Sequence, residues 1–230
     1  MLEWLLTPDH RRRRLAQRAP AGPLQSFLST PFPEGDRDCR EVEYLALDLE
    51  TTGLDAQRDA IISVGMVGLT GTRIDLATAE HRIVRVNRDM PEQSVIVHQL
   101  TDDTVAAGEP LPRVLADVLR RLAGKVLIAH HARIEFHFLR RACAEVYRGE
   151  FLIPVVDTEF LARHWFEQRN KPFSPRDLRL ANLRTRYNLP RYPAHNALSD
   201  ALACGELFAA QIAERESKHP MPLKKLLVRL

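Results

Sequence analysis

The order of apolar segments along the chain constrains the fold most strongly. Three candidate strands follow one another through short turn-like links, GLDAQRD and TGTRID, which predicts an antiparallel meander. Two further strands then alternate with helical patterns. The candidate strands are residues 43–50, 60–69, 79–87, 125–130 and 151–157. The candidate helices are residues 111–123, 132–148, 158–168, 178–187 and 197–217. This order predicts an α/β fold with a mixed five-stranded sheet flanked by helices.

The two ends of the chain differ from its middle. Residues 1–40 begin with an apolar and basic segment and continue with the Pro-, Gly- and Ser-rich stretch APAGPLQSFLSTPFPEGDRD, which predicts a short helix and an irregular arm. The end of the chain, HPMPLKKLLVRL, carries two prolines and basic residues. We expect an N-terminal extension over 1–40, a main domain over 41–217, and a C-terminal tail over 218–230 that leaves this domain.

Composition favours a folded protein of the cytoplasm. Hydrophobic residues make up 45% and charged residues 27% of the chain, which is ordinary for a globular domain. No apolar stretch reaches the roughly 18 residues of a membrane span, and the N-terminal apolar segment is too short for a secretory signal. Cys39, Cys143 and Cys204 are odd in number and widely spaced. They are expected to be reduced thiols that fill core or surface positions.

The basic residues are strongly biased towards arginine. Of the 33 basic residues, 28 are Arg and 5 are Lys, although the net charge is only +3. Guanidinium groups bind phosphate through two parallel hydrogen bonds, so the bias suits a nucleic-acid surface. Solvated helix faces are the alternative interpretation, and for the run Arg11–Arg14 it is the favoured one.

Two carboxylates interrupt the first strand, in YLALDLETTG. Residues i and i+2 of a strand face the same side, so Asp48 and Glu50 are predicted to project together. Two like charges at that spacing raise each other's pKa unless a cation lies between them. A hard divalent ion such as Mg²⁺ or Mn²⁺ meets this need. The alternative is an exposed strand face whose acids pair with arginine. Thr51 and Gly53 favour the metal site, because they offer a hydroxyl and room for a substrate.

Two further segments offer partners for these acids. His195 and Asp200 stand five residues apart at the start of a helix with an apolar stripe; the alternative roles are a loop histidine and an acid that compensates the helix dipole. Glu135 shares a stripe with apolar residues near the start of another helix and therefore needs a partner. The preceding His130 and His131 are hydrogen-bonded strand-end residues or, much less favoured, zinc ligands with Glu135, because the spacing is not H-E-x-x-H.

Taken together, D-x-E-T-T-G, an acid after a His-bearing strand, and H-x₄-D resemble the DEDDh family of 3′-to-5′ exonucleases. The resemblance covers about residues 43–215. VHQLTDD and VVDTEFLAR are similar to two lesser family segments. The resemblance implies an RNase H-like exonuclease fold, and it implies that two divalent ions, Mg²⁺ or Mn²⁺, are bound by four acids. These are Asp48, Glu50, Glu135 and Asp200, with His195 as the general base. Residues that resemble the lining of the terminal nucleotide are Thr51, Gly53, Leu54 and His98.

One position departs from the family pattern. The second motif usually reads H-N-x-x-[FY]-D, whereas this chain has His130, His131 and then Glu135. Glutamate keeps the charge but reaches one methylene further. Because Mg²⁺ demands a near-ideal octahedron, weaker activity or a preference for Mn²⁺ is expected.

The resemblance implies a metal-dependent exonuclease that acts on the 3′ ends of single-stranded DNA or RNA, with DNA favoured, and releases nucleoside 5′-monophosphates. One alternative is an RNA exonuclease similar to RNase T or oligoribonuclease. Another is a module of the same fold that binds nucleic acid or a polymerase with weak catalysis. The two terminal extensions are candidate contacts for a polymerase or another protein, and no membrane contact is expected.

Overall fold

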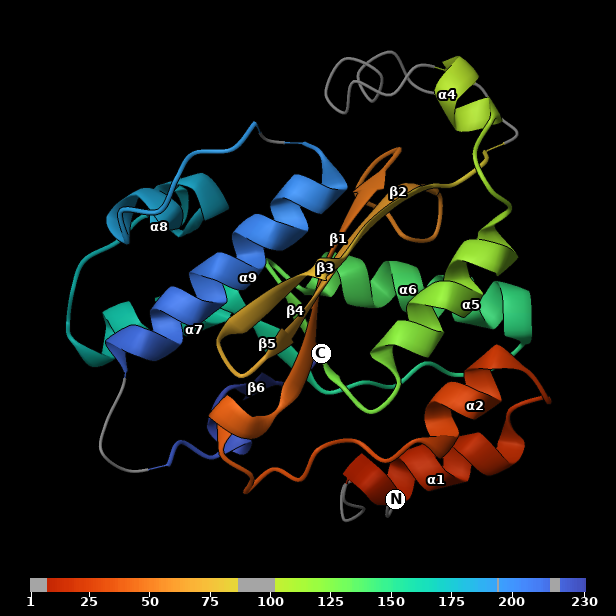
Figure 1. Ribbon diagram of the computed structural model, residues 1–230, viewed down its shortest axis with the longest axis horizontal. Helices are drawn as coiled ribbons and strands as arrows, with labels where there is room; N and C mark the ends of the chain where they lie inside the picture. Colours follow the sequence, from red (N-terminus) through yellow and green to blue (C-terminus); the bar gives the residue numbers. More distant parts are fainter. Residues whose placement is uncertain (1–7, 87–101, 194, 216–219) are drawn as a thin grey trace.

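The computed structural model describes residues 8–86, 102–193, 195–215 and 220–230, and contains one mixed sheet flanked by helices (Figure 1). The strand order is β3-β2-β1-β4-β5-β6. The strands are β1 (Glu43–Thr51), β2 (Ile61–Thr70), β3 (Arg73–Ile83), β4 (Val126–Ala129), β5 (Val155–Asp157) and β6 (Leu227–Val228). The sheet has six strands where five were expected, because the end of the chain adds β6. The predicted mixed sheet is confirmed.

The strands pair in two ways. β1, β2 and β3 form the expected antiparallel meander, and β4 and β5 continue the sheet in parallel with β1. The prediction that the third strand covers 79–87 was wrong, because β3 begins at Arg73. Gly71 has a φ of 58°, which allows a two-residue turn, so that Thr70 pairs with Arg73 directly.

Helices cover both faces of the sheet (Figure 1). The α-helices are α1 (Pro8–Arg18), α2 (Pro23–Ser29), α4 (Asp102–Ala106), α5 (Leu111–Leu122), α6 (Arg133–Tyr147), α7 (Thr158–Gln168), α8 (Leu180–Arg186) and α9 (Ala197–Glu214). Short 3-10 turns are η2 (Cys39–Glu41), η3 (Pro175–Leu178) and η4 (Leu223–Lys225). The helix predicted over 178–187 is divided between η3 and α8, and the other predicted helices lie close to α5, α6, α7 and α9.

The central strand β1 separates two hydrophobic clusters. Leu45, Leu47 and Leu49 pack into the cluster that α5 and α6 cover. Tyr44 and Ala46 pack into the cluster that α9 covers. The alternation of side chains along a strand therefore directs the next two residues of the second set, the carboxylates of β1, towards the start of α9.

The N-terminal residues form more structure than expected. Instead of one short helix, α1 and α2 form a hairpin that packs on α5, with Leu24, Phe27 and Leu28 buried. Arg12 is buried too, and its guanidinium donates to the Leu28 carbonyl. An irregular segment then leads to η2.

The C-terminal residues were predicted to leave the domain, and this was wrong. Leu223 and Leu226 are buried against the α9 side of the sheet, and β6 pairs antiparallel with β5. The prolines suggested an irregular tail, but Pro222 is the N-cap of η4 and does not interrupt a helix. The apolar residues that follow it cover the edge of β5, which would otherwise be open.

All three cysteines are buried free thiols, as the sequence predicted for reduced residues of the core. In the described part of the chain, no helix combines the length and the apolar character that crossing a membrane requires.

Candidate active site

Three acidic residues meet where β1 ends and α9 begins. One carboxylate oxygen from each of Asp48, Glu50 and Asp200 lies within 4.8 Å of the corresponding oxygens of the other two. Asp48 and Glu50 are on β1, and Asp200 is in the first turn of α9. The structure therefore brings together the predicted i and i+2 pair of the strand and an acid from 150 residues further along the chain.

A glycine lets α9 approach the sheet this closely. Gly65 on β2 is the register partner of Asp48, and a Cβ at Gly65 would overlap the backbone of Ala197 and Leu198. Any larger side chain would push the start of α9, and with it Asp200, away from the strand. The sequence analysis missed Gly65. The sequence offered only a glycine inside an apolar strand as a signal. The contact that requires this glycine is made by α9, more than 100 residues further along the chain.

Glu135 is the fourth acid of the region. It is 3% exposed, in the first turn of α6, and its Oε2 has no hydrogen-bond partner among the described residues. Burial raises the pKa of Glu135 to about 8, and the charges of Asp157 and Glu50 act in the same direction. Glu135 is not part of the group of three within 4.8 Å. It is nevertheless near enough to be the strongest charge acting on Asp48.

The acids of the site destabilise one another's charged forms, and a bound cation would relieve this repulsion. Burial raises the pKa of Asp48 well above its ordinary value, and Glu135, Glu50 and Asp200 each raise it further. Burial likewise raises the pKa of Asp200. No ion pair with lysine or arginine reaches Asp48, Glu135 or Asp200 from the residues that the structure describes. This contradicts the alternative in which such acids pair with arginine on an exposed strand face.

Asp157 fixes the loop that precedes α6, the helix that carries Glu135. Its carboxylate accepts hydrogen bonds from the backbone N–H groups of Glu159 and Phe160 and so caps α7. It also accepts from His131 N at 3.1 Å and Ala132 N at 3.0 Å, immediately before α6. The sequence analysis noted VVDTEFLAR only as a family-like segment. An aspartate directly before a helix is a capping signal, but its contact with the second loop depends on tertiary structure.

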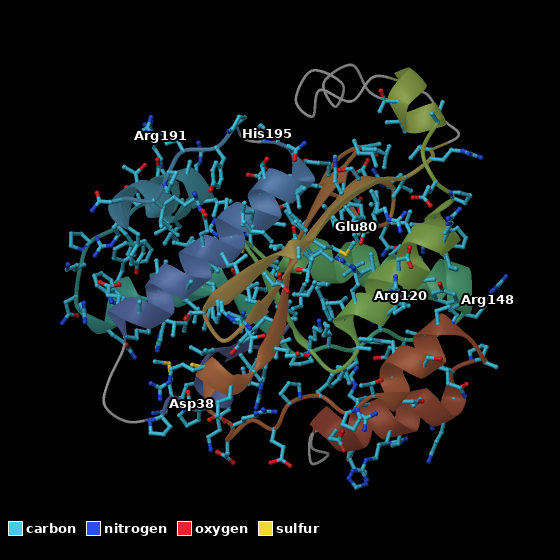
Figure 2. The ribbon with its side chains drawn as sticks, viewed as in Figure 1. Asp38, Glu80, Arg120, Arg148, Arg191 and His195 are labelled. Carbon is cyan, nitrogen blue, oxygen red and sulfur yellow. The ribbon has the colours of Figure 1, made fainter. Side chains whose placement is uncertain are left out.

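His195 stands at the mouth of the site. It is exposed, has a φ of 67°, and donates its backbone N–H to Asp200 Oδ2 at 2.8 Å. Figure 2 shows it on the segment that leads into α9, at the edge of the molecule. The structure thus brings His195 next to the acids, and its role as general base stays a prediction.

The residues expected to line a nucleotide lie at the end of β1. Thr51 donates its hydroxyl to the Gly53 carbonyl at 2.6 Å. At Gly53 a Cβ would come within 2.5 Å of the Asp59 carboxylate, so any larger residue there would displace the Asp59 side chain. Leu54 is 79% exposed. His98 lies outside the described residues.

The two histidines before α6 are hydrogen-bonded. His130 Nδ1 lies 2.8 Å from Thr158 Oγ1, and His131 Nδ1 lies 3.0 Å from Glu159 Oε2. Burial lowers the pKa of His130. Within the described ranges, the only group of metal-ligating side chains is the three-acid cluster, so the less favoured zinc site of His130, His131 and Glu135 is not formed.

A groove lies between the segment after β1 and α6. It has a volume of about 780 Å³. One wall is the segment after β1, with Leu54 and Gln57, and the other is α6, with Arg133, His137 and Arg140. The groove therefore joins an exposed apolar side chain to several basic ones.

The fold and the site define an exonuclease. The RNase T exonuclease family matches residues 45–208 of this chain, which is more than half of its length. This protein belongs to that family, and the order of its acids along the chain resembles that of the DEDDh group of 3′-to-5′ exonucleases.

Named relatives agree with this family. The DNA polymerase III subunit epsilon of Treponema pallidum is 30% identical over 178 residues, which cover 77% of this chain and 80% of the relative. The PolC-type DNA polymerase III of Thermotoga maritima is 27% identical over 168 residues, 73% of this chain. This chain spans only 12% of that relative, so the activities of the longer protein do not transfer directly.

Solved structures show the same fold. Escherichia coli exonuclease I in a zinc-bound complex with single-stranded DNA superposes with a TM-score of 0.66 at 16% identity, covering 76% of this chain and 41% of the other. The nuclease domain of 3′hExo, a DEDDh family member bound to rAMP, gives 0.64 at 15% identity, covering 77% and 94%. The predicted RNase H-like exonuclease fold is confirmed.

Proposed function

We propose that this protein is a metal-dependent exonuclease that removes nucleotides from the 3′ end of single-stranded nucleic acid, with DNA favoured, and releases nucleoside 5′-monophosphates. The observation that carries the proposal is the meeting of Asp48, Glu50 and Asp200 within 4.8 Å, beside the buried Glu135. Family membership supports phosphodiester hydrolysis as the reaction.

The acids of the site fit divalent cations. All four side chains offer only oxygen, which is the ligand that Mg²⁺ and Mn²⁺ prefer. The raised pKa of Asp48 and the unpartnered Oε2 of Glu135 are both expected of a site that binds cations. In such a site the bound cations, and not the protein, neutralise the carboxylates. We infer that Asp48, Glu50, Glu135 and Asp200 hold two such ions. The longer reach of Glu135 favours Mn²⁺, because Mg²⁺ tolerates little distortion.

Each residue then has a defined task. When bound, the two ions would lower the pKa of the attacking water and neutralise charge on the phosphate. His195 accepts the proton of that water, since an imidazole ordinarily titrates near neutral pH. Its backbone bond to Asp200 holds the residue beside the acids. Thr51, Gly53, Leu54 and His98 line the terminal nucleotide, with the exposed Leu54 side chain free to lie against a base.

RNA is the second candidate substrate. The 3′hExo nuclease domain, which shares the fold, was crystallised with rAMP, whereas exonuclease I was crystallised with single-stranded DNA. The relatives named DNA polymerase III subunit epsilon favour DNA and suggest a polymerase as a protein partner. A cytoplasmic location is part of the same proposal.

A ladder assay tests the proposal. Single-stranded DNA and RNA of equal sequence, each labelled at the 5′ end, are incubated with protein and Mg²⁺, Mn²⁺ or a chelator. We expect stepwise shortening from the 3′ end with either metal, faster with DNA, and none with chelator. Asp48→Ala is expected to lower the rate by roughly 100-fold or more while the domain stays folded, which a cooperative thermal unfolding transition verifies.

Glu43→Ala provides the matched control, because Glu43 is an exposed acid at the start of the same strand. It should give the wild-type ladder. If wild-type protein shortens neither DNA nor RNA with either metal, the proposed function is wrong. Tight binding of single strands without metal binding or turnover would instead favour the binding module.

A further inference from the structure

Positive charge is concentrated in one segment of this chain. Residues 163–193, which comprise most of α7, η3, α8 and the following loop, hold eight of the 33 basic residues but only two of the 30 acidic ones. The segment therefore has a formal charge of +6, whereas the whole chain has +3. The remaining residues together are net negative, so the basic character of this protein is local.

Most of these cations face solvent without a compensating acid. Seven of the eight basic residues are exposed, and Arg184 alone is buried. Within the described part of the chain, five have no carboxylate at ion-pair distance. These five residues are Lys171, Arg176, Arg179, Arg186 and Arg191. Like charges that crowd one surface repel one another, and a bound polyanion removes that repulsion.

The crowding is greatest over one aromatic ring. The charged groups of Arg169, Lys171 and Arg186 lie 4.4, 4.7 and 4.3 Å from the ring centre of Trp165. The indole is buried beneath them, with 5% exposure, so it attracts the cations through its faces and keeps them together. Arg169 alone of the three is near an acid, Glu214, at 3.8 Å.

Helix α7, which contributes to this segment, also exposes an aromatic platform. On α7, the ring of Phe160 stacks on His164, with an angle of 8° between the planes and 6.1 Å between ring centres. Phe160 is 45% exposed and His164 is exposed too, so both rings are accessible from solvent. Proteins that hold single strands combine such rings, on which bases stack, with a basic surface for the phosphates.

This surface adjoins the mouth of the active site. Arg191 and His195 are four residues apart in the segment that connects α8 to α9, so their Cα atoms are separated by at most roughly 14 Å. Figure 2 shows both along the same edge of the molecule. At the other end of the surface, Glu159 at the start of α7 bonds to His131, in the loop before the helix α6 that carries Glu135.

We propose that the exposed cations of residues 163–191, together with Phe160 and His164, form a second binding surface for single-stranded nucleic acid, which holds the strand upstream of the 3′ end that the acids cleave. This inference rests on the proposed function for its ligand. Arginine outnumbers lysine seven to one here, and guanidinium groups bind phosphate through two parallel hydrogen bonds. The exposed rings favour an unpaired strand over a duplex, whose bases are already stacked.

Strand binding by a triple variant tests the surface. Lys171→Gln, Arg179→Gln and Arg186→Gln remove three exposed charges that have no ion pair and are outside the catalytic residues. Binding of a fluorescent DNA single strand of roughly 30 nucleotides is measured in chelator, so that the strand stays intact. We expect binding to weaken by roughly tenfold or more, and the slope of log affinity against log salt to decrease by about 2.

The matched control removes the same charge from the other side of the molecule. Arg11→Gln, Arg13→Gln and Arg18→Gln lie on α1, far from α8 in Figure 1, and should leave affinity within about twofold, because any uniform effect of net charge is small at moderate salt. Thermal unfolding of both variants verifies that they fold. With Mn²⁺, the triple variant should cleave the long strand more slowly and a dinucleotide at the wild-type rate.

Three outcomes would overturn the inference: equal loss of binding in both variants, no loss in the test variant, or no binding of the strand by wild-type protein. None of these depends on turnover. Failure of the proposed function therefore shows itself separately, as binding without cleavage.

Discussion

Asp48 is unfavourable for the stability of the metal-free protein and well suited to binding a cation. Its neighbours Glu135, Glu50 and Asp200 each raise its pKa, and no arginine or lysine among the described residues offsets them. Acids crowded in this way weaken the folded protein unless a cation joins them. The arrangement is therefore understandable as a site whose stability is completed by metal.

Glu135→Gln separates the charge of the fourth acid from its shape. Because the carboxylate is buried with a partnerless Oε2, the neutral amide should make the metal-free protein more resistant to heat. Activity with Mn²⁺ should fall by roughly 100-fold, since a metal ligand is lost. Calorimetry in chelator and the ladder assay measure the two effects. Wild-type activity in this variant would show that Glu135 lies outside the working site.

Some of these residues could be predicted from the sequence because their reason is local. The two-residue period of a strand was enough to pair Asp48 with Glu50. Asp200 and Glu135 were added by the order of motifs that resembles the family. Asp157 was not recognised, because its carboxylate bonds to backbone N–H groups about 25 residues away, and no local pattern contains that partner.

At the scale of elements, the contact between α9 and β2 positions the site. Gly65 lies opposite Asp48 and against the backbone of Ala197. Further along the same helix, Gly205 faces Ala46 with ordinary clearance, since a Cβ there would lie 3.5 Å from the Ala46 side chain. Of these two glycines at one interface, only Gly65 is required by the close approach of α9 to the sheet.

Substituting each glycine by alanine should give opposite results. Gly65→Ala forces α9 outward and should destabilise the domain by about 1–3 kcal/mol, with loss of activity because Asp200 moves with the helix. Gly205→Ala adds helix propensity without overlap and should stabilise by about 0.5–1 kcal/mol, with activity kept. Urea unfolding and the ladder assay measure both. A tolerated Gly65→Ala would contradict the close approach.

The elements that the sequence mispredicted have physical explanations. The first half of β3 is rich in polar and turn-forming residues and was assigned to a loop, yet the two-residue turn at Gly71 and pairing with β2 extend the strand to Arg73. β6 has only two residues, and the residues of β5 that pair with them are 71 and 73 positions away in the chain. A strand of two residues is too short to show a periodic sequence pattern, so its pairing with a strand far away in the chain could not be predicted.

At the scale of the whole molecule, the segment that leads into β1 contacts the C-terminal residues. The segment before β1 and the segment before η4 bond to each other, with Cys39 N donating to Met221 O at 2.9 Å and Leu223 N to Arg37 O at 2.9 Å. Asp38 joins this contact, because its carboxylate bonds to Arg40 and to the backbone of Met221. The C-terminal residues are thus part of the folded unit.

This contact should depend on pH. The hydrogen bonds from Arg40 hold the pKa of Asp38 at about 2, below its ordinary 3.8. A lowered pKa contributes stability that is complete above the unfolded value and is lost as pH falls through the folded one. Wild-type protein should therefore exceed Asp38→Asn in free energy of unfolding by a constant amount above about pH 5, and by less and less from pH 4 to pH 2. Urea titrations across this range measure the difference, and a difference that does not vary with pH would contradict it.

Crystals grown with Mn²⁺ test most directly whether the acids of β1, α6 and α9 surround cations. Anomalous scattering identifies the metal without reference to the protein's activity. The predicted result is manganese peaks within roughly 2–2.5 Å of carboxylate oxygens of Asp48, Glu50 and Asp200, with Glu135 turned towards one of them. Maps with no peak between these side chains at saturating Mn²⁺, or with Asp48 bound to an arginine instead, would contradict the metal-dependent mechanism.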